Sequence, residues 1–282
     1  MTTSIQLSGL QAADLALPRL AERSVPASGV MIAKDAGATI AQALRSMRFC
    51  REIVVVVDER SSDETLTVAE ELADRIEVRP WQGYGPTKQA AVDLAAHAWI
   101  LMIDADEWLS PELAMSVAEA VDDADPSVAY QLRRRTRFLG RWMLHGDWGR
   151  DRVLRLFHRE TGGPTADAIH ESVQVEARKL LLKGLLYHEG DQTLQAYLER
   201  QNRYTTLAAK GLFGRGRRTT MLATAIRPVF KFLQSYILRL GFLDGWQGLV
   251  LAYYSAVAVF TKYAKLYALQ HRQQRPDAES IG

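Results

Sequence analysis

The sequence contains a single cysteine, Cys50, so it has no intrachain disulfide framework, and a reducing compartment suits it. The first twenty residues lack a basic start followed by an apolar core, and we therefore expect no secretory signal. The formal net charge of +2 is close to neutral and gives no general reason to expect nucleic acid as a partner. With 48% hydrophobic and 24% charged residues, the composition is that of a folded globular protein.

Acidic residues are missing from the stretch 200–240, whose only charged residues are Lys and Arg. The adjoining segment 241–269 is apolar and aromatic, but its longest uncharged run only approaches the roughly 17–25 residues that a spanning helix needs. We expect residues 193–270 to form a helical, basic and amphipathic region that lies on an anionic membrane surface. The alternative is a C-terminal helix that packs on the main domain.

The first half of the chain alternates short apolar runs with segments of helical spacing. Four consecutive valines, 54–57, indicate a strand that is buried on both faces, as in a parallel sheet covered by helices. Ser61 and Glu64 have the spacing of a capping box at the start of a helix. The alternation predicts an α/β fold with a doubly wound sheet. The expected strands are 29–35, 52–58, 76–80 and 99–104, and the expected helices are 38–49, 61–74 and 85–98.

The predicted organisation has four parts. Residues 128–160 are rich in Arg and Trp, and we expect a more irregular region over residues 128–190. The parts are an N-terminal extension (1–27), a main α/β domain (28–192), the helical region (193–270) and a disordered tail (271–282).

Acidic side chains follow three of the predicted strands. Asp35, Asp58 and the pair Asp104 and Asp106 all stand at strand ends, and ligands of such sheets bind beyond the carboxyl ends of the strands. Two carboxylates one residue apart can converge on Mg²⁺ or Mn²⁺, which prefer oxygen ligands and can neutralise a leaving diphosphate. The alternative is a helix start, but Ser110 and Pro111 supply that signal without either acid.

The order of several motifs resembles the GT-A fold of family 2 inverting glycosyltransferases. These motifs are "VMIAKD", "IVVVVDERSSDET", "WQGYGPTKQAAVDLA" and "WILMIDADEWLSPEL". The later segments "FLGRWMLHGDW", "RVLRLFHR", "IHESV", "YHEG" and "GFLDGWQG" resemble the lipopolysaccharide-core β-glucosyltransferase subgroup. The resemblance covers about residues 28–268. It implies a GT-A, Rossmann-like mixed sheet flanked by helices, followed by a helical membrane-associating region.

The resemblance also implies a reaction. A hexose, expected to be glucose, moves from a UDP-linked or similar nucleotide sugar to a hydroxyl of a lipid-linked saccharide, expected to be the lipopolysaccharide inner core. The implied place is the cytoplasmic face of the bacterial inner membrane, with the enzyme peripherally bound.

The residue roles that the resemblance implies fall into three groups. Ala33, Asp35, Asp58, Lys88 and Asp104 would bind the nucleotide sugar. Asp106 would be the main ligand of Mg²⁺ or Mn²⁺, with Asp104 and His188 beside it. Glu171 is the expected general base, Asp151 the second candidate, and Arg155 would stabilise the diphosphate charge.

Purely structural alternatives exist for three of these residues. Glu171 could form a surface salt bridge, His188 could be a hydrogen-bonded core residue, and Arg155 could be a strand residue that pairs with Asp151. Departures from the family pattern are "KDAG" after the first strand and Gln89 where Asn is common.

Three other functions remain as alternatives. An enzyme of the same fold could glycosylate polyprenyl phosphate, whose acceptor oxygen is already ionised and needs no strong base. A non-catalytic membrane-associated module could bind a nucleotide without turnover. A nucleotidyltransferase would need a Gly-rich triphosphate loop, which "AKDAGATI" matches poorly.

Overall fold

The computed structural model describes residues 25–123, 125–165 and 173–273, and the chain divides into two units. The described residues up to 135, together with 151–189, form the first unit. Residues 136–150 and the described residues from 190 onward form the second. Most of the predicted extension 1–27 and most of the predicted tail 271–282 lie outside the described residues.

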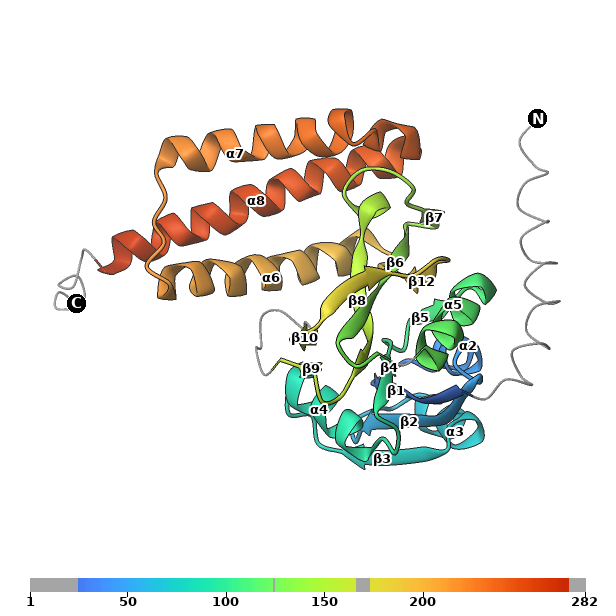
Figure 1. Ribbon diagram of the computed structural model, residues 1–282. Coiled ribbons are helices and arrows are strands. Elements are labelled where there is room, and N and C mark those ends of the chain that lie inside the picture. The colour runs from blue at the N-terminus through green and yellow to red at the C-terminus, as the bar shows by residue number, and fades with distance from the viewer. Residues whose placement is uncertain (1–24, 124, 166–172, 274–282) are drawn as a thin grey trace. The chain divides into compact units, whose positions relative to one another are not determined.

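The first unit is built on a mixed sheet (Figure 1), which agrees with the predicted fold class. The strand order is β3-β2-β1-β4-β8-β6-β12-β5, and β11 also pairs with β6. The first four strands in this order are parallel, whereas β8 runs antiparallel to both β4 and β6. The strands are β1 (Val25–Ala33), β2 (Cys50–Asp58), β3 (Arg75–Arg79), β4 (Trp99–Met102), β5 (Glu107–Leu109), β6 (Val128–Phe138), β8 (Arg152–His158), β11 (Arg178–Leu181) and β12 (Leu186–Glu189). Off the main sheet, β9 (Gly162–Pro164) pairs with β10 (Val173–Val175).

Helices cover both faces of the parallel strands. The valines of β2 alternate, so that Val55 and Val57 join one apolar cluster while Val54 and Val56 join the other. All four are buried, which confirms the prediction of a strand covered on both faces. The first cluster includes residues of α2 (Ile40–Ser46), α3 (Thr65–Leu72) and α5 (Pro111–Asp122), and the second includes residues of α4 (Tyr84–Leu94).

The predicted capping box at Ser61 and Glu64 was wrong. Helix α3 begins at Thr65, and its N-cap residue Glu64 makes no side-chain capping bond. The Ser61 hydroxyl instead accepts a hydrogen bond from the backbone N–H of Asp35 at 2.9 Å. The Ser61 hydroxyl therefore bonds to the loop after β1 and does not cap α3. At α5, by contrast, the Ser110 hydroxyl does accept from the N–H of Leu113, at 3.2 Å.

The second unit is mainly helical. Its long helix α8 packs against both α6 and α7. The buried Asp244 accepts hydrogen bonds from the backbone N–H groups of Leu144 and His145, at 3.1 and 2.8 Å, and thereby fastens the 136–150 segment to the helices. Its elements are β7 (Arg141–Trp142), η1 (Trp148–Arg150), α6 (Leu194–Gly214), α7 (Met221–Leu233), η2 (Gln234–Leu238), η3 (Gly241–Asp244) and α8 (Gly245–Gln273). Among the described helices, none is both long enough and apolar enough to cross a membrane.

Candidate functional site

Asp104 lies just beyond β4 and is held between two cations. The Nζ atom of Lys88 is 2.8 Å from its Oδ1 atom, and the guanidinium of Arg155 binds its Oδ2 atom. Burial alone would raise the pKa of Asp104, but the charges of Arg155 and Lys88 outweigh it and hold that pKa well below its usual range. Asp104 is therefore ionised at any physiological pH, and each of its oxygens already has a cationic partner.

Glu107 is a completely buried carboxylate that sequence reasoning missed as a site residue. Nη2 of Arg155 lies 2.8 Å from it, Nη1 of Arg134 lies 3.1 Å from it, and the backbone N–H of Asp104 donates to it at 3.1 Å. A buried charge of this kind is stable only when it is paired and hydrogen-bonded. The available signal was a third acid directly after the Asp104–Asp106 pair, in a segment that is otherwise apolar.

Arg134 extends this network to Asp151, the second candidate for the general base. Its Nε and Nη2 atoms lie 2.8 and 2.7 Å from Oδ2 of Asp151. The partner of Asp151 is thus Arg134, and the alternative in which Arg155 pairs with Asp151 was wrong. Lys88, Asp104, Arg155, Glu107, Arg134 and Asp151 form one continuous chain of charges, in which each acid contacts at least one base.

Asp106 is the more open of the two predicted metal ligands. Its side chain is 43% exposed, and its Oδ2 atom is 3.3 Å from Nε2 of His188. The two are brought together because β12 pairs antiparallel with β5, which places His188 opposite Glu107, and because the N–H of Glu189 donates to the carbonyl of Asp106 at 2.9 Å. The structure therefore joins two residues that are far apart in the sequence and were both predicted as ligands.

The arrangement fits a metal that takes part of its ligand shell from a substrate. Mg²⁺ is commonly held by one or two carboxylates, while phosphate oxygens and water complete its coordination. Asp106 beside His188 suits such a site, whereas Asp104 would have to exchange Lys88 or Arg155 for the ion. Across the described ranges, no group of three or more His, Cys, Asp or Glu residues could hold an ion by itself.

Asp58 and Asp35 organise the loops at the ends of β2 and β1. The Oδ1 atom of Asp58 accepts from the N–H of Arg60 at 2.9 Å, and this bond, together with the charge of Arg60, lowers the pKa of Asp58. Its Oδ2 atom is buried and has no hydrogen-bond partner in the described part of the chain. Such an atom suits a donor group from a ligand. The carboxylate of Asp35 accepts from the N–H of Ser62 at 2.9 Å and joins the two loops.

Of the remaining predicted site residues, Ala33 and Lys88 are described by the structure and Glu171 is not. Ala33 is the buried last residue of β1, next to the Asp35 loop, and Lys88 is buried in α4. Glu171 lies outside the described residues, so its role as the general base stays a prediction. The nucleotide, metal and catalytic roles of the other residues also stay predictions, because no ligand tests them.

A family model identifies the class of protein. The model for glycosyl transferase family 2 matches residues 28–184, which is more than half of the chain. The chain therefore belongs to glycosyl transferase family 2 and is a glycosyltransferase. This confirms the family resemblance and, together with the mixed sheet flanked by helices, the predicted GT-A fold class.

Three known proteins are similar to this chain. An uncharacterised glycosyltransferase of Rickettsia typhi is 28% identical over 86% of this chain and 87% of its own length. The lipopolysaccharide core biosynthesis glycosyltransferase LpsC of Rhizobium meliloti is 27% identical over 90% of this chain and 97% of its own length.

The third is a solved structure, that of TarS from S. aureus. A crystal structure of its residues 1–349 in complex with UDP-GlcNAc is 14% identical and has a TM-score of 0.40, over 88% of this chain and 92% of that one. A longer TarS crystal structure has a TM-score of 0.41 at 14% identity over 86% of this chain, which spans 55% of that longer chain.

Proposed function

We propose that this glycosyltransferase moves a hexose, glucose, from a UDP-linked donor to a hydroxyl group of a lipid-linked saccharide, with inversion at the anomeric carbon. The observation that carries the proposal is the partly exposed Asp106–His188 pair beside the cation-bound Asp104, at the carboxyl edge of the parallel strands. Cations and an open carboxylate in one place suit a diphosphate that arrives with a divalent ion.

The donor would occupy the loops that follow β1, β2 and β4. Asp58 offers a buried oxygen without a described partner, which suits a hydroxyl or N–H donor of the nucleoside. Lys88 and Arg155 hold Asp104 in one position, and Asp104 would contact the ribose or the ion by exchanging one of these two cations. Asp106 and His188 would hold Mg²⁺ or Mn²⁺, and the ion would supply positive charge to the departing diphosphate.

The transfer itself is a single displacement. The acceptor oxygen bonds to the anomeric carbon, the bond from that carbon to the diphosphate breaks, and UDP leaves with the electron pair. The acceptor proton passes to a carboxylate. Glu171 is the first candidate for this base and Asp151 the second. Arg134 fixes the orientation of Asp151 through two short contacts, as a positioned base requires.

The acceptor would be the inner core of lipopolysaccharide at the cytoplasmic face of the inner membrane. Two observations support this part of the proposal. The similar protein LpsC is named for lipopolysaccharide core biosynthesis. The stretch 201–243, which contains Lys and Arg but no acid, suits an anionic membrane surface.

Transfer assays with a panel of nucleotide sugars test the proposal. Purified protein would be incubated with Mg²⁺ or Mn²⁺ and with lipopolysaccharide acceptors that lack outer sugars. We expect one UDP-hexose to be consumed and its sugar to appear on the acceptor with inverted stereochemistry. Glu171→Gln or Asp151→Asn should abolish transfer while leaving donor binding intact.

Two other outcomes would favour the alternative functions. Transfer to a polyprenyl phosphate that survives both substitutions would replace the saccharide acceptor with the phosphate one. Binding of a nucleotide without turnover of any donor would favour the non-catalytic module.

A further inference from the structure

Helix α7 reverses the usual burial pattern of a surface helix, because its buried side chain is polar and most of its large apolar side chains are exposed. The residue that it buries is Thr224, and the residue buried by the following η2 is Ser235. Six large apolar side chains of α7 and η2 point outward, with 47–69% of their surface exposed. These exposed residues are Leu222, Ile226, Val229, Phe230, Leu233 and Ile237, which we call the α7 apolar face.

The spacing of the α7 apolar face makes it a continuous surface. Leu222, Ile226, Val229 and Leu233 follow one another at intervals of three or four residues, which places them on one side of the helix. A contiguous apolar surface on a folded protein usually marks a site of contact with a membrane or another protein.

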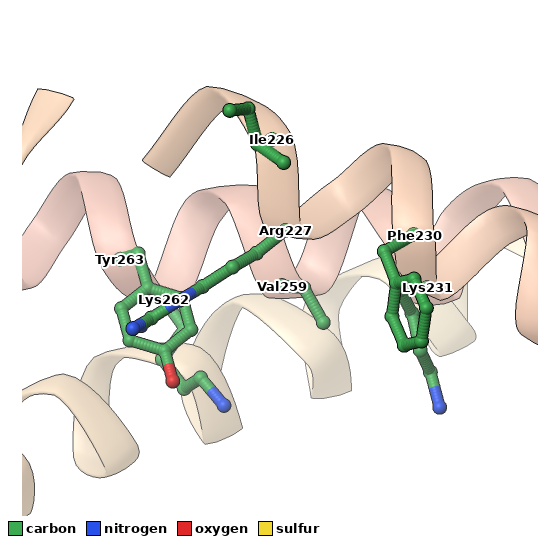
Figure 2. A pocket seen from close by; sticks show the side chains of 7 residues that line it. All are labelled: Ile226, Arg227, Phe230, Lys231, Val259, Lys262 and Tyr263. Atoms are coloured by element: carbon green, nitrogen blue, oxygen red, sulfur yellow. The ribbon is translucent and has the colours of Figure 1, made fainter. Parts of the chain in front are cut away.

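Basic side chains border this face. A groove of about 450 Å³ between α7 and α8 has apolar walls that include Phe230 and Val259, and it also carries Arg227, Lys231 and Lys262 (Figure 2). Figure 2 shows Arg227 extending toward the ring of Tyr263, which lies 4.1 Å from its guanidinium carbon.

The charges of this groove are only partly balanced. Lys231 pairs with Asp147 at 2.7 Å, but within the described ranges no carboxylate pairs with Arg227 or Lys262. The sequence itself has no acid between residues 201 and 243. The groove therefore presents net positive charge next to exposed apolar side chains.

We propose that the α7 apolar face and this groove dock on an anionic phospholipid bilayer. Apolar side chains of an interfacial helix enter the boundary between headgroups and acyl chains, while Lys and Arg beside them meet the lipid phosphates. This inference deepens the membrane part of the proposed function. It assigns the contact to named residues of α7, whereas the sequence alone indicated the whole region 193–270.

A second copy of the chain suits this surface less well. A symmetric dimer would bring the same patch of both copies together, so that the basic side chains of one copy would lie close to those of the other. Like charges at an interface oppose association, and the stretch 201–243 contains no acid to pair with them. An anionic bilayer has the complementary charge.

Vesicle sedimentation tests the inference with the full-length protein. The probes are vesicles of phosphatidylcholine alone and vesicles of phosphatidylcholine with phosphatidylglycerol. The variant is the pair Ile226→Asp and Phe230→Asp, and the matched control is Met115→Asp on α5, because Met115 is 48% exposed in the first unit. The milder pair Leu222→Ser and Val229→Ser replaces the charged pair if circular dichroism shows that the latter does not fold.

We expect the wild type and Met115→Asp to bind the anionic vesicles and to bind the neutral ones more weakly. The α7 variant should lose about tenfold or more in affinity, because two apolar side chains no longer enter the bilayer. Arg227→Gln with Lys262→Gln should reduce binding to the anionic vesicles alone.

Three results would overturn the inference. These are no binding by the wild type, equal binding by the α7 variant, or a wild-type dimer that the variant dissociates without any change in vesicle binding. The vesicle assay contains no sugar donor, and donor consumption can be measured without vesicles. A failure of this inference is therefore distinguishable from a failure of the proposed transferase reaction.

Discussion

The carboxylate of Glu107 lies 2.8 Å from the guanidinium of Arg155, and both side chains are almost completely shielded from solvent. The same carboxylate also pairs with Arg134, so two cations depend on it. One of them holds Asp104 and the other holds Asp151. Glu107 therefore positions the two ends of the charge network without itself facing the solvent.

Replacing Glu107 with Ala should destabilise the first unit strongly. Removal of the Glu107 carboxylate leaves the buried positive charge of Arg155 with Asp104 as its remaining partner. Breaking a buried ion pair in this way typically lowers the free energy of unfolding by about 3–5 kcal/mol. Urea unfolding at neutral pH measures the change. Glu107→Gln, which keeps hydrogen-bond acceptors, should lose less, and Glu112→Gln, an exposed position on α5, should change little. Equal stability of Glu107→Ala and the wild type would show that the network does not support the fold.

Lowering the pH should reduce the contribution of Asp104 to the stability of the folded protein. Arg155 and Lys88 hold the pKa of Asp104 well below its usual range in the folded protein, against the opposing effect of burial. An Asp in an unfolded chain has a pKa of about 3.9, so the unfolded state takes up the proton first as the pH falls. The stability due to this carboxylate is therefore present above about pH 4 and is lost progressively below it.

The comparison with Asp104→Asn isolates that effect. The difference in unfolding free energy between the wild type and this variant should narrow as the pH is lowered from about 6 to about 3. Urea titrations across this range measure it. A difference that stays constant would mean that the pKa of Asp104 is the same in the folded and unfolded states.

Cys50 should be inert in the native protein. Burial raises the pKa of its thiol to about 12, which lowers the thiolate fraction at pH 8 roughly a thousandfold compared with an exposed cysteine. Labelling with a chromogenic disulfide reagent should be slow in buffer and fast in denaturant. Rapid labelling of the native protein would show that β2 opens readily.

Gly184→Ala should be much more destabilising than Gly140→Ala. Both glycines have positive φ values, +90° and +81°, which cost an alanine about 1–2 kcal/mol. At Gly184 an added Cβ would also lie 2.4 Å from the backbone nitrogen of Leu113 at the start of α5, whereas at Gly140 it meets nothing within 4 Å. Thermal unfolding should show a loss of about 2–4 kcal/mol at Gly184 and about 1 kcal/mol at Gly140. Similar losses at both sites would contradict this account.

The parallel half of the sheet was predictable because its signals are local. The run Val54–Val57 indicated burial on both faces, and the acids at the ends of β1, β2 and β4 indicated the ligand edge. The antiparallel part, with β8 between β4 and β6, depends on pairings between distant segments that no local pattern records.

The candidate site was predictable in its residues but less so in their partners. Asp106 and His188 were expected near one another, and the pairing of β12 with β5 explains why they are, whereas the carboxylate of Asp104 contacts Lys88 and Arg155. The roles of Glu107 and Arg134 were not foreseen, because an acid and a base that meet only in the folded core look in the sequence like ordinary charged residues.

The central claim is that Asp106 contributes to a metal-dependent site for the nucleotide sugar. Calorimetric titration of UDP in the presence and absence of Mn²⁺, with the wild type and Asp106→Asn, tests it most directly. Asp123→Asn, an exposed position at the end of α5, is the control. We expect Mn²⁺ to strengthen UDP binding to the wild type and the control by about tenfold or more, and to have little effect on Asp106→Asn. UDP binding that is unchanged by both the metal and the substitution would contradict the account.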